Sequence, residues 1–212
     1  MEGNAGNDTI SGDEGHDILL GGDGEDSMFG GAGQDEMWGE QHADQMEGGP
    51  GNDLMYGGSH NDTMFGNDGD DEMFGESGAD EMDGGAGRDL LEGAQGDDRM
   101  HGGADSDLLI GDVGFDRLFG GWGDDVIYGH LVGDQSTITQ EYIEGGPDDD
   151  FICGTDGPNE IYGGTATEGY ENYIDPPIIP DELPGGFSIV SCTSEDPPLV
   201  CLLYTSPSPR DS

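Results

Sequence analysis

Two nine-residue stretches show the pattern that organises most of this chain: Gly30-Gly-Ala-Gly-Gln-Asp-Glu-Met-Trp38 and Gly120-Gly-Trp-Gly-Asp-Asp-Val-Ile-Tyr128. The same spacing begins at Gly3 and continues without a slip to Tyr128, which gives 14 consecutive nonads. Position 1 is Gly and position 6 is Asp in all 14, and position 8 is always Met, Leu or Ile. A fixed short period of this kind is typical of a solenoid built from repeated coils.

The composition excludes several classes of partner. The 212 residues include 49 acids, four arginines and no lysine, and the formal net charge is −45. Nucleic acids and anionic membrane surfaces are bound through Lys and Arg, so neither is expected to bind here. No apolar run is long enough for a transmembrane segment. Only 31% of residues are hydrophobic, which with this charge is typical of a disordered chain, unless a divalent metal is part of the structure.

The nonad resembles the RTX, or haemolysin-type, calcium-binding repeat, Gly-Gly-x-Gly-x-Asp-x-U-x, in which U is a large aliphatic residue. The resemblance covers residues 3–128 and, more weakly, 145–162. It implies an all-β, right-handed parallel β-roll, in which six residues form a calcium-holding turn, three form a short strand, and two nonads complete a coil. It also implies an extracellular protein of the type I secretion class that folds when it meets calcium.

The residue types at each position suit calcium. Glycines at positions 1, 2 and 4 permit backbone conformations closed to other residues and let main-chain carbonyls approach an ion. Position 6 is never Glu, which indicates a tight turn rather than a solvated acidic surface, and calcium takes six to eight oxygen ligands. We expect each ion between equivalent turns of nonads n and n+2, so the 14 nonads allow up to about 12 calcium ions.

The predicted ligands follow from this register. The carboxylate ligands are Asp8, Asp17, Asp26, Asp35, Asp44, Asp53, Asp62, Asp71, Asp80, Asp89, Asp98, Asp107, Asp116, Asp125 and Asp150. The carbonyl ligands lie near Gly6, Gly15, Gly22, Gly24, Gly31, Gly33, Gly49, Gly51, Gly69, Gly78, Gly85, Gly87, Gly96, Gly114, Gly121 and Gly123.

Three nonads have His42, His60 or Asp105 in place of Gly at position 4, and we expect weaker calcium binding at these corners. His42 and His60 lie exactly two nonads apart, so a coil of two nonads places them at the same corner. They form either a transition-metal pair or pH switch, or simply a replacement for Gly, because His tolerates left-handed backbone better than most residues.

The outward positions 7 and 9 show that the structural period is two nonads. All but three of these residues are apolar in even-numbered nonads, whereas all but three are polar or charged in odd-numbered nonads. A two-nonad coil places the two sets on opposite sheets, which predicts about seven regular coils. The apolar set comprises Ile18, Leu20, Trp38, Leu54, Tyr56, Phe74, Leu90, Leu108, Ile110, Val126 and Tyr128. It is a candidate surface for a protein partner or self-association, unless these residues merely suit strands.

The sequence divides into four parts. Residues 1–128 form the regular roll, 129–162 an irregular segment with two degenerate repeats, and 163–200 an acidic Pro-rich linker or the start of another module. Residues 201–212 resemble a translated sequencing adapter and are expected to be foreign. Met1 falls on position 8 of the register, so we expect it to be internal to a longer array. Cys153 and Cys192 are candidates for a disulfide in an oxidising compartment.

The chain shows no catalytic motif of the His-Glu-x-x-His or Gly-x-Ser-x-Gly type, so we predict a calcium-binding β-roll that is not an enzyme in this fragment. Two alternatives stay open. The chain is the repeat region of a secreted protease, lipase, epimerase or toxin whose catalytic domain lies elsewhere, or it is an adhesive roll that uses the apolar even-numbered sheet.

Overall fold

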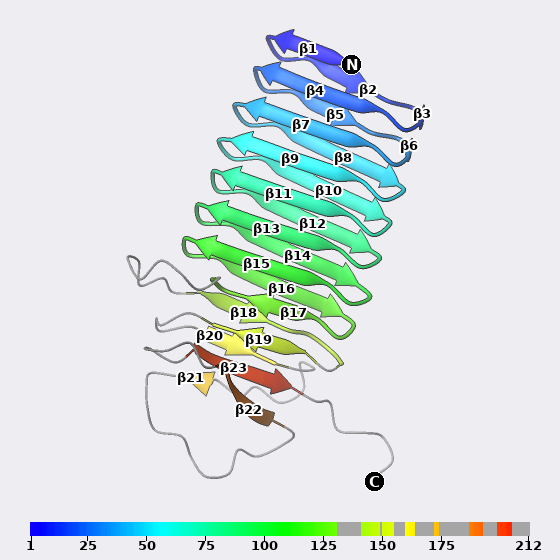
Figure 1. Ribbon diagram of the computed structural model, residues 1–212. Helices are drawn as coiled ribbons and strands as arrows, with labels where there is room; N and C mark the ends of the chain where they lie inside the picture. Colours follow the sequence, from blue (N-terminus) through cyan, green and yellow to red (C-terminus); the bar gives the residue numbers. More distant parts are fainter. Residues whose placement is uncertain are drawn as a thin grey trace.

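The computed structural model describes residues 1–130, 141–148, 150–154, 160–163, 172–173, 187–192 and 199–204. The chain winds into a parallel β-roll of about eight turns, stacked from the N-terminal coil to the C-terminal coil, as predicted (Figure 1). The described residues contain no helix that could span a membrane.

Even-numbered nonads supply the strands of one sheet, which we call the even sheet. In spatial order its parallel strands are β1 (Glu2–Ala5), β4 (Ile18–Asp23), β7 (Glu36–Gln41), β9 (Leu54–Ser59), β11 (Glu72–Ser77), β13 (Leu90–Gln95), β15 (Leu108–Val113), β17 (Val126–Tyr128) and β19 (Phe151–Cys153). Two antiparallel strands follow, β23 (Leu199–Tyr204) and β22 (Phe187–Cys192).

Odd-numbered nonads supply the second sheet, the odd sheet. Its parallel strands are β2 (Thr9–Ser11), β5 (Ser27–Phe29), β8 (Gln45–Pro50), β10 (Thr63–Asp68), β12 (Glu81–Ala86), β14 (Arg99–Ala104), β16 (Arg117–Trp122), β18 (Tyr142–Glu144) and β20 (Glu160–Tyr162), and β21 (Asn172–Tyr173) adds an antiparallel edge. A small third sheet pairs β3 (Glu14–Gly15) with β6 (Ala32–Gly33). The predicted separation of odd and even nonads is confirmed.

The coil advances by two nonads throughout the regular array. Met64, for example, pairs with Met46 on one side and Met82 on the other. Most of these strands are longer than the three residues expected: β9 runs on through Gly57 and Gly58 to Ser59. The prediction of a six-residue turn was therefore wrong, because the strand continues through position 1, positions 2 and 3 still pair with the neighbouring coil, and only positions 4 to 6 remain as the turn.

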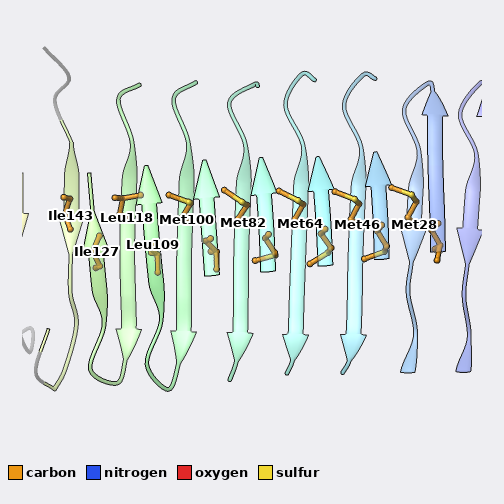
Figure 2. Close-up of a cluster of buried hydrophobic side chains, with 14 of the residues drawn as sticks. Met28, Met46, Met64, Met82, Met100, Leu109, Leu118, Ile127 and Ile143 are labelled. Carbon is orange, nitrogen blue, oxygen red and sulfur yellow. The ribbon is translucent and has the colours of Figure 1, made fainter. Parts of the chain in front are cut away.

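Position 8 forms the core. Its side chains point between the two sheets in two rows, one residue per nonad (Figure 2). From Leu19 to Ile127 each position-8 side chain is at most 1% exposed. A thin core of single Met, Leu and Ile residues is all that the alternating strands can bury, since positions 7 and 9 point outward.

The outer face of the even sheet carries stacked aromatic rings. Trp38 and Tyr56 lie 4.0 Å apart between ring centroids, and Tyr56 and Phe74 lie 5.0 Å apart, with interplanar angles of 17° and 13°. These rings cover one another, so they are half-buried although they face outward. Ile18 remains 55% exposed at the start of the strip.

The C-terminal part of the roll keeps the register after an insertion. Arg117 pairs with Tyr142 and Val126 with Phe151, a longer step than the two nonads of the regular array. The irregular segment contributes β18 at Tyr142–Glu144, and β23 includes residues of the segment that resembles an adapter. Cys153 is disulfide-bonded, but the side chain of Cys192 lies outside the described residues, so the predicted pairing stays a prediction.

Candidate metal centre

The aspartates at position 6 form two ladders, one along each edge of the roll. The Oδ1 atom of Asp44 accepts a hydrogen bond from the backbone N–H of Asp26 at 2.7 Å, and Oδ1 of Asp62 accepts one from Asp44 at 2.8 Å. The same bond links each position-6 residue to the one two nonads later throughout the regular array. One carboxylate oxygen of each rung therefore holds neighbouring coils together.

The second carboxylate oxygen is buried and accepts no hydrogen bond within the described residues. This is true of Oδ2 in Asp8, Asp26, Asp35, Asp44, Asp53, Asp62, Asp71, Asp80, Asp89, Asp98, Asp107, Asp116, Asp125 and Asp150. Asp8 and Asp17, the first rungs of the two ladders, are half-buried as residues, and Oδ2 of Asp17 does not belong to the set. A buried anionic oxygen without a partner is costly, so two regular rows of them fit a bound cation and are hard to reconcile with a fold that lacks one.

From Asp44 onward, burial raises the pKa of the carboxyl groups in these rows, and repulsion between successive rungs adds to the effect at several of them. The pKa is about 8 for Asp62, Asp107, Asp116 and Asp150, about 7 for Asp71 and Asp80, and about 6 for Asp44, Asp53, Asp89, Asp98 and Asp125. Without a cation, part of each ladder therefore keeps its protons at neutral pH. A bound cation favours the ionised form instead.

Glycine is required at position 1 for a different reason from the one the sequence suggested. Position-1 glycines do not adopt a left-handed backbone. Instead, a Cβ atom on Gly39 would lie 2.6 Å from Oδ2 of Asp44 and 2.5 Å from the carbonyl oxygen of Gly57. The position-6 carboxylate thus packs directly on the α-carbon of position 1, and any side chain there would displace it.

Position 2 adopts left-handed backbone in every regular nonad, as expected, and position 4 does so except at Gly78 and Gly114. Gly22 and Gly24, for example, have φ values of 110° and 150°. The carbonyl oxygens at these positions face the same position in the next coil: that of Gly6 lies against Gly24, and that of Gly31 against Gly49. The predicted carbonyl residues therefore lie in columns along the edges that also carry the aspartates.

Side chains alone do not complete a metal site. No group of three or more His, Cys, Asp or Glu side chains that could hold a metal ion occurs in the described parts of the chain. Each turn contributes one buried carboxylate, so main-chain carbonyls would have to supply most of the six to eight oxygens that calcium takes.

The corners without Gly at position 4 keep the same turn. His42, His60 and Asp105 have φ values of 76°, 85° and 77°, in the left-handed region. Asp44, Asp62 and Asp107 of these nonads remain in the ladders. His therefore does replace Gly in the conformation of the backbone.

Glu141 is a ladder residue that the sequence analysis missed. It is 1% exposed, and its Oε2 accepts the hydrogen bond from the backbone N–H of Asp116 at 3.1 Å, the place that Asp takes in the regular coils. Counting back from Ile143 as position 8 would have found it. Asp150 likewise accepts from Asp125 at 3.1 Å, which places the last predicted aspartate in the ladder.

A parallel β-roll with a row of buried carboxylates along each edge defines the class of protein as a β-solenoid of short repeats. The family model of the RTX calcium-binding nonapeptide repeat, which comprises four copies of the repeat, matches residues 2–37, 38–73, 74–109, 101–135 and 142–166. The chain belongs to this family of calcium-binding repeats. No curated protein matches it.

Proposed function

We propose that the position-6 carboxylates of successive coils hold calcium ions along both edges of the roll, up to about 12 in the regular array. The observation that carries this proposal is the double row of buried Oδ2 atoms without hydrogen bonds. Carbonyl oxygens of positions 2 and 4 in the same turns would supply the remaining ligands. Bound calcium would supply positive charge between like-charged rungs.

The donor chemistry favours calcium over other divalent ions. Carboxylate and carbonyl oxygens are hard ligands, whereas zinc prefers His and Cys, of which the position-6 turns offer few. Magnesium demands near-ideal octahedral geometry and keeps several waters, which a site built from main-chain carbonyls supports poorly.

Calcium binding would be coupled to folding. The chain carries a net charge of −45, and its core is one buried side chain per nonad. Repulsion among the acids opposes the compact state, and the small core cannot offset it without cations. Export into surroundings rich in calcium would then be the event that triggers folding.

The test is a calcium titration of the full chain followed by far-UV circular dichroism, starting from the chelated protein. We expect a disordered spectrum that becomes β-rich as calcium rises to millimolar concentration. Magnesium at the same concentration and ionic strength is the control for charge screening, and it should leave most of the chain disordered. A spectrum unchanged by millimolar calcium, or an equal response to magnesium, would contradict the proposal.

The role of the roll depends on the domains that accompany it in its parent protein. We propose a binding and folding module without catalysis of its own, which serves a secreted enzyme or toxin, or an adhesin. The outward strip of the even sheet supports docking of a partner or a second copy, because Trp38, Tyr56 and Phe74 form a continuous stack. Changing these three residues to Ser should abolish docking or self-association, and unchanged light scattering and binding would exclude it.

A further inference from the structure

Two imidazoles occupy the same exposed corner of adjacent coils. The rings of His42 and His60 lie 5.2 Å apart between centroids, with an interplanar angle of 12°. Both residues sit at position 4, where the left-handed backbone fixes the direction in which the side chain leaves the turn. No other pair of histidines among the described residues forms such a stack.

The partners of the two rings determine which nitrogen carries the proton. Nδ1 of His60 lies 2.8 Å from the carbonyl oxygen of Ser59, and Nδ1 of His42 lies 3.2 Å from Oδ1 of Asp23. A carbonyl or carboxylate oxygen can only accept, so each Nδ1 donates and each Nε2 carries the lone pair. Histidines that bind metals are held in the same way, with the second ring nitrogen bonded to a carboxylate or a backbone carbonyl.

We propose that His42 and His60 form a site for a borderline transition-metal ion such as Cu²⁺, Ni²⁺ or Zn²⁺, distinct from the carboxylate ladders. Imidazole suits these ions and is not a calcium ligand. With two protein ligands the site is open, and water fills the other positions of the ion. Acidic Asp23 beside His42 adds favourable charge.

The stacked rings have to turn toward each other to share one ion, because their in-plane lone pairs now point in nearly parallel directions. An ion at about 2.0–2.1 Å from each Nε2 requires these atoms to approach to roughly 3 Å. The ring torsion of His is broad, and the side chain of His42 is 49% exposed, so rotation of exposed rings can achieve this without moving the backbone.

The experiment uses the full chain at saturating calcium and moderate salt, which suppresses binding to the acidic surface. Isothermal titration with Ni²⁺ should give one ion per chain in addition to any weak background. His42→Asn and His60→Asn keep a residue that tolerates left-handed backbone, and each should weaken binding roughly 10-fold or more. Asp23→Ala, which removes the partner of Nδ1, should weaken it roughly 10-fold. His16→Asn, a single exposed imidazole elsewhere on the roll, should leave it unchanged.

Electron paramagnetic resonance with one equivalent of Cu²⁺ gives an independent readout. We expect hyperfine splitting from two imidazole nitrogens in the unchanged protein and in His16→Asn, and its loss in His42→Asn and in His60→Asn. Circular dichroism at saturating calcium establishes that each variant is folded. Equal Ni²⁺ affinity in folded His42→Asn, His60→Asn and unchanged protein, or a signal without two nitrogens, would overturn the proposal.

Discussion

The regular coils up to Tyr128 and the coils that follow achieve the same fold with different sequences. In the regular coils the step is 18 residues and every position 6 is Asp; beyond Tyr128 the first step is 25 residues and Glu141 takes the place of Asp. Position 8 stays apolar and buried in both, at Leu118 and at Ile143. The fold therefore requires an apolar position 8 and a hydrogen-bond acceptor at position 6. The 18-residue step and the choice of Asp at position 6 belong to the repeated motif.

The largest expected effect comes from neutralising adjacent rungs in the regular coils. The variant combines Asp62→Asn, Asp80→Asn and Asp98→Asn. Each Asn keeps an oxygen for the rung hydrogen bond but removes the charge at Oδ2. We expect the midpoint of calcium-induced folding, followed by circular dichroism, to rise on the order of tenfold or more, because fewer anionic ligands weaken calcium sites.

The matched control removes three charges from exposed positions in the same part of the roll. Asp97 precedes Asp98 in its turn, and Asp68 and Asp70 lie near the ladder of the opposite edge. Asp68→Asn, Asp70→Asn and Asp97→Asn together should shift the midpoint little, because these exposed side chains lie outside the ladders. Asn keeps the oxygen that accepts from the backbone N–H of Arg88 or Phe115, and the exposed ion pair of Asp70 with Arg88 contributes little. An equal shift in both triple variants would mean that only net charge matters and that the ladder has no special role.

The second effect is on the pH dependence of the metal-free protein. The pKa of Asp62, Asp107 and Asp116 is about 8 in the fold, against an ordinary value near 4 in the unfolded chain. Between these values the folded state holds protons that the unfolded state has released, so the stability of the metal-free fold falls as pH rises from about 4 to about 8.

Circular dichroism of the chelated protein should therefore show more β-structure at pH 4 than at pH 8, and the calcium-loaded protein should not lose structure over this range. Asp150 also has a pKa of about 8, so we expect the same pH dependence for the coil after the insertion. Metal-free protein that gains structure as pH rises would contradict the cause that we assign to the raised pKa values.

The third effect compares the two regions through their cores. Met64 is fully buried in the middle of the array, and Met64→Ala should cost about 2–5 kcal/mol in the calcium-loaded protein. Ile161 is 6% exposed near the end of the roll, so Ile161→Ala should cost less. Guanidinium denaturation at fixed calcium measures both, and equal costs would show that the two regions do not differ in packing.

The smallest expected effect is that of Glu141→Gln, which keeps the length and an acceptor oxygen but removes the charge. Amide hydrogen exchange should increase in β18 and in the adjacent β16, with β10 unchanged, because only the C-terminal coils depend on this rung. Loss of protection in β10 as well would mean that the whole roll unfolds as one unit.

The sequence predicted the architecture because a strict period leaves little freedom. The phase of Asp and of the apolar residues gave the two sheets, the two-nonad coil and the core from Ile10 to Ile127. It failed where distances decide rather than patterns. Two features could not be predicted because they depend on contacts between residues that the repeat pattern does not describe. Position 1 must be Gly because Asp44 packs on Gly39, and the strands continue to position 3 because they pair with the neighbouring coil. Glu141 was missed because the inserted residues hide the register.

Anomalous diffraction from crystals grown in calcium would show directly where calcium lies in the roll. We predict anomalous peaks about 2.3–2.6 Å from the Oδ2 atoms of the position-6 aspartates. The peaks should form two rows, and each row should have one peak between successive coils. Folded coils whose Oδ2 atoms contact only water or carry protons, with no peaks beside them, would contradict the account.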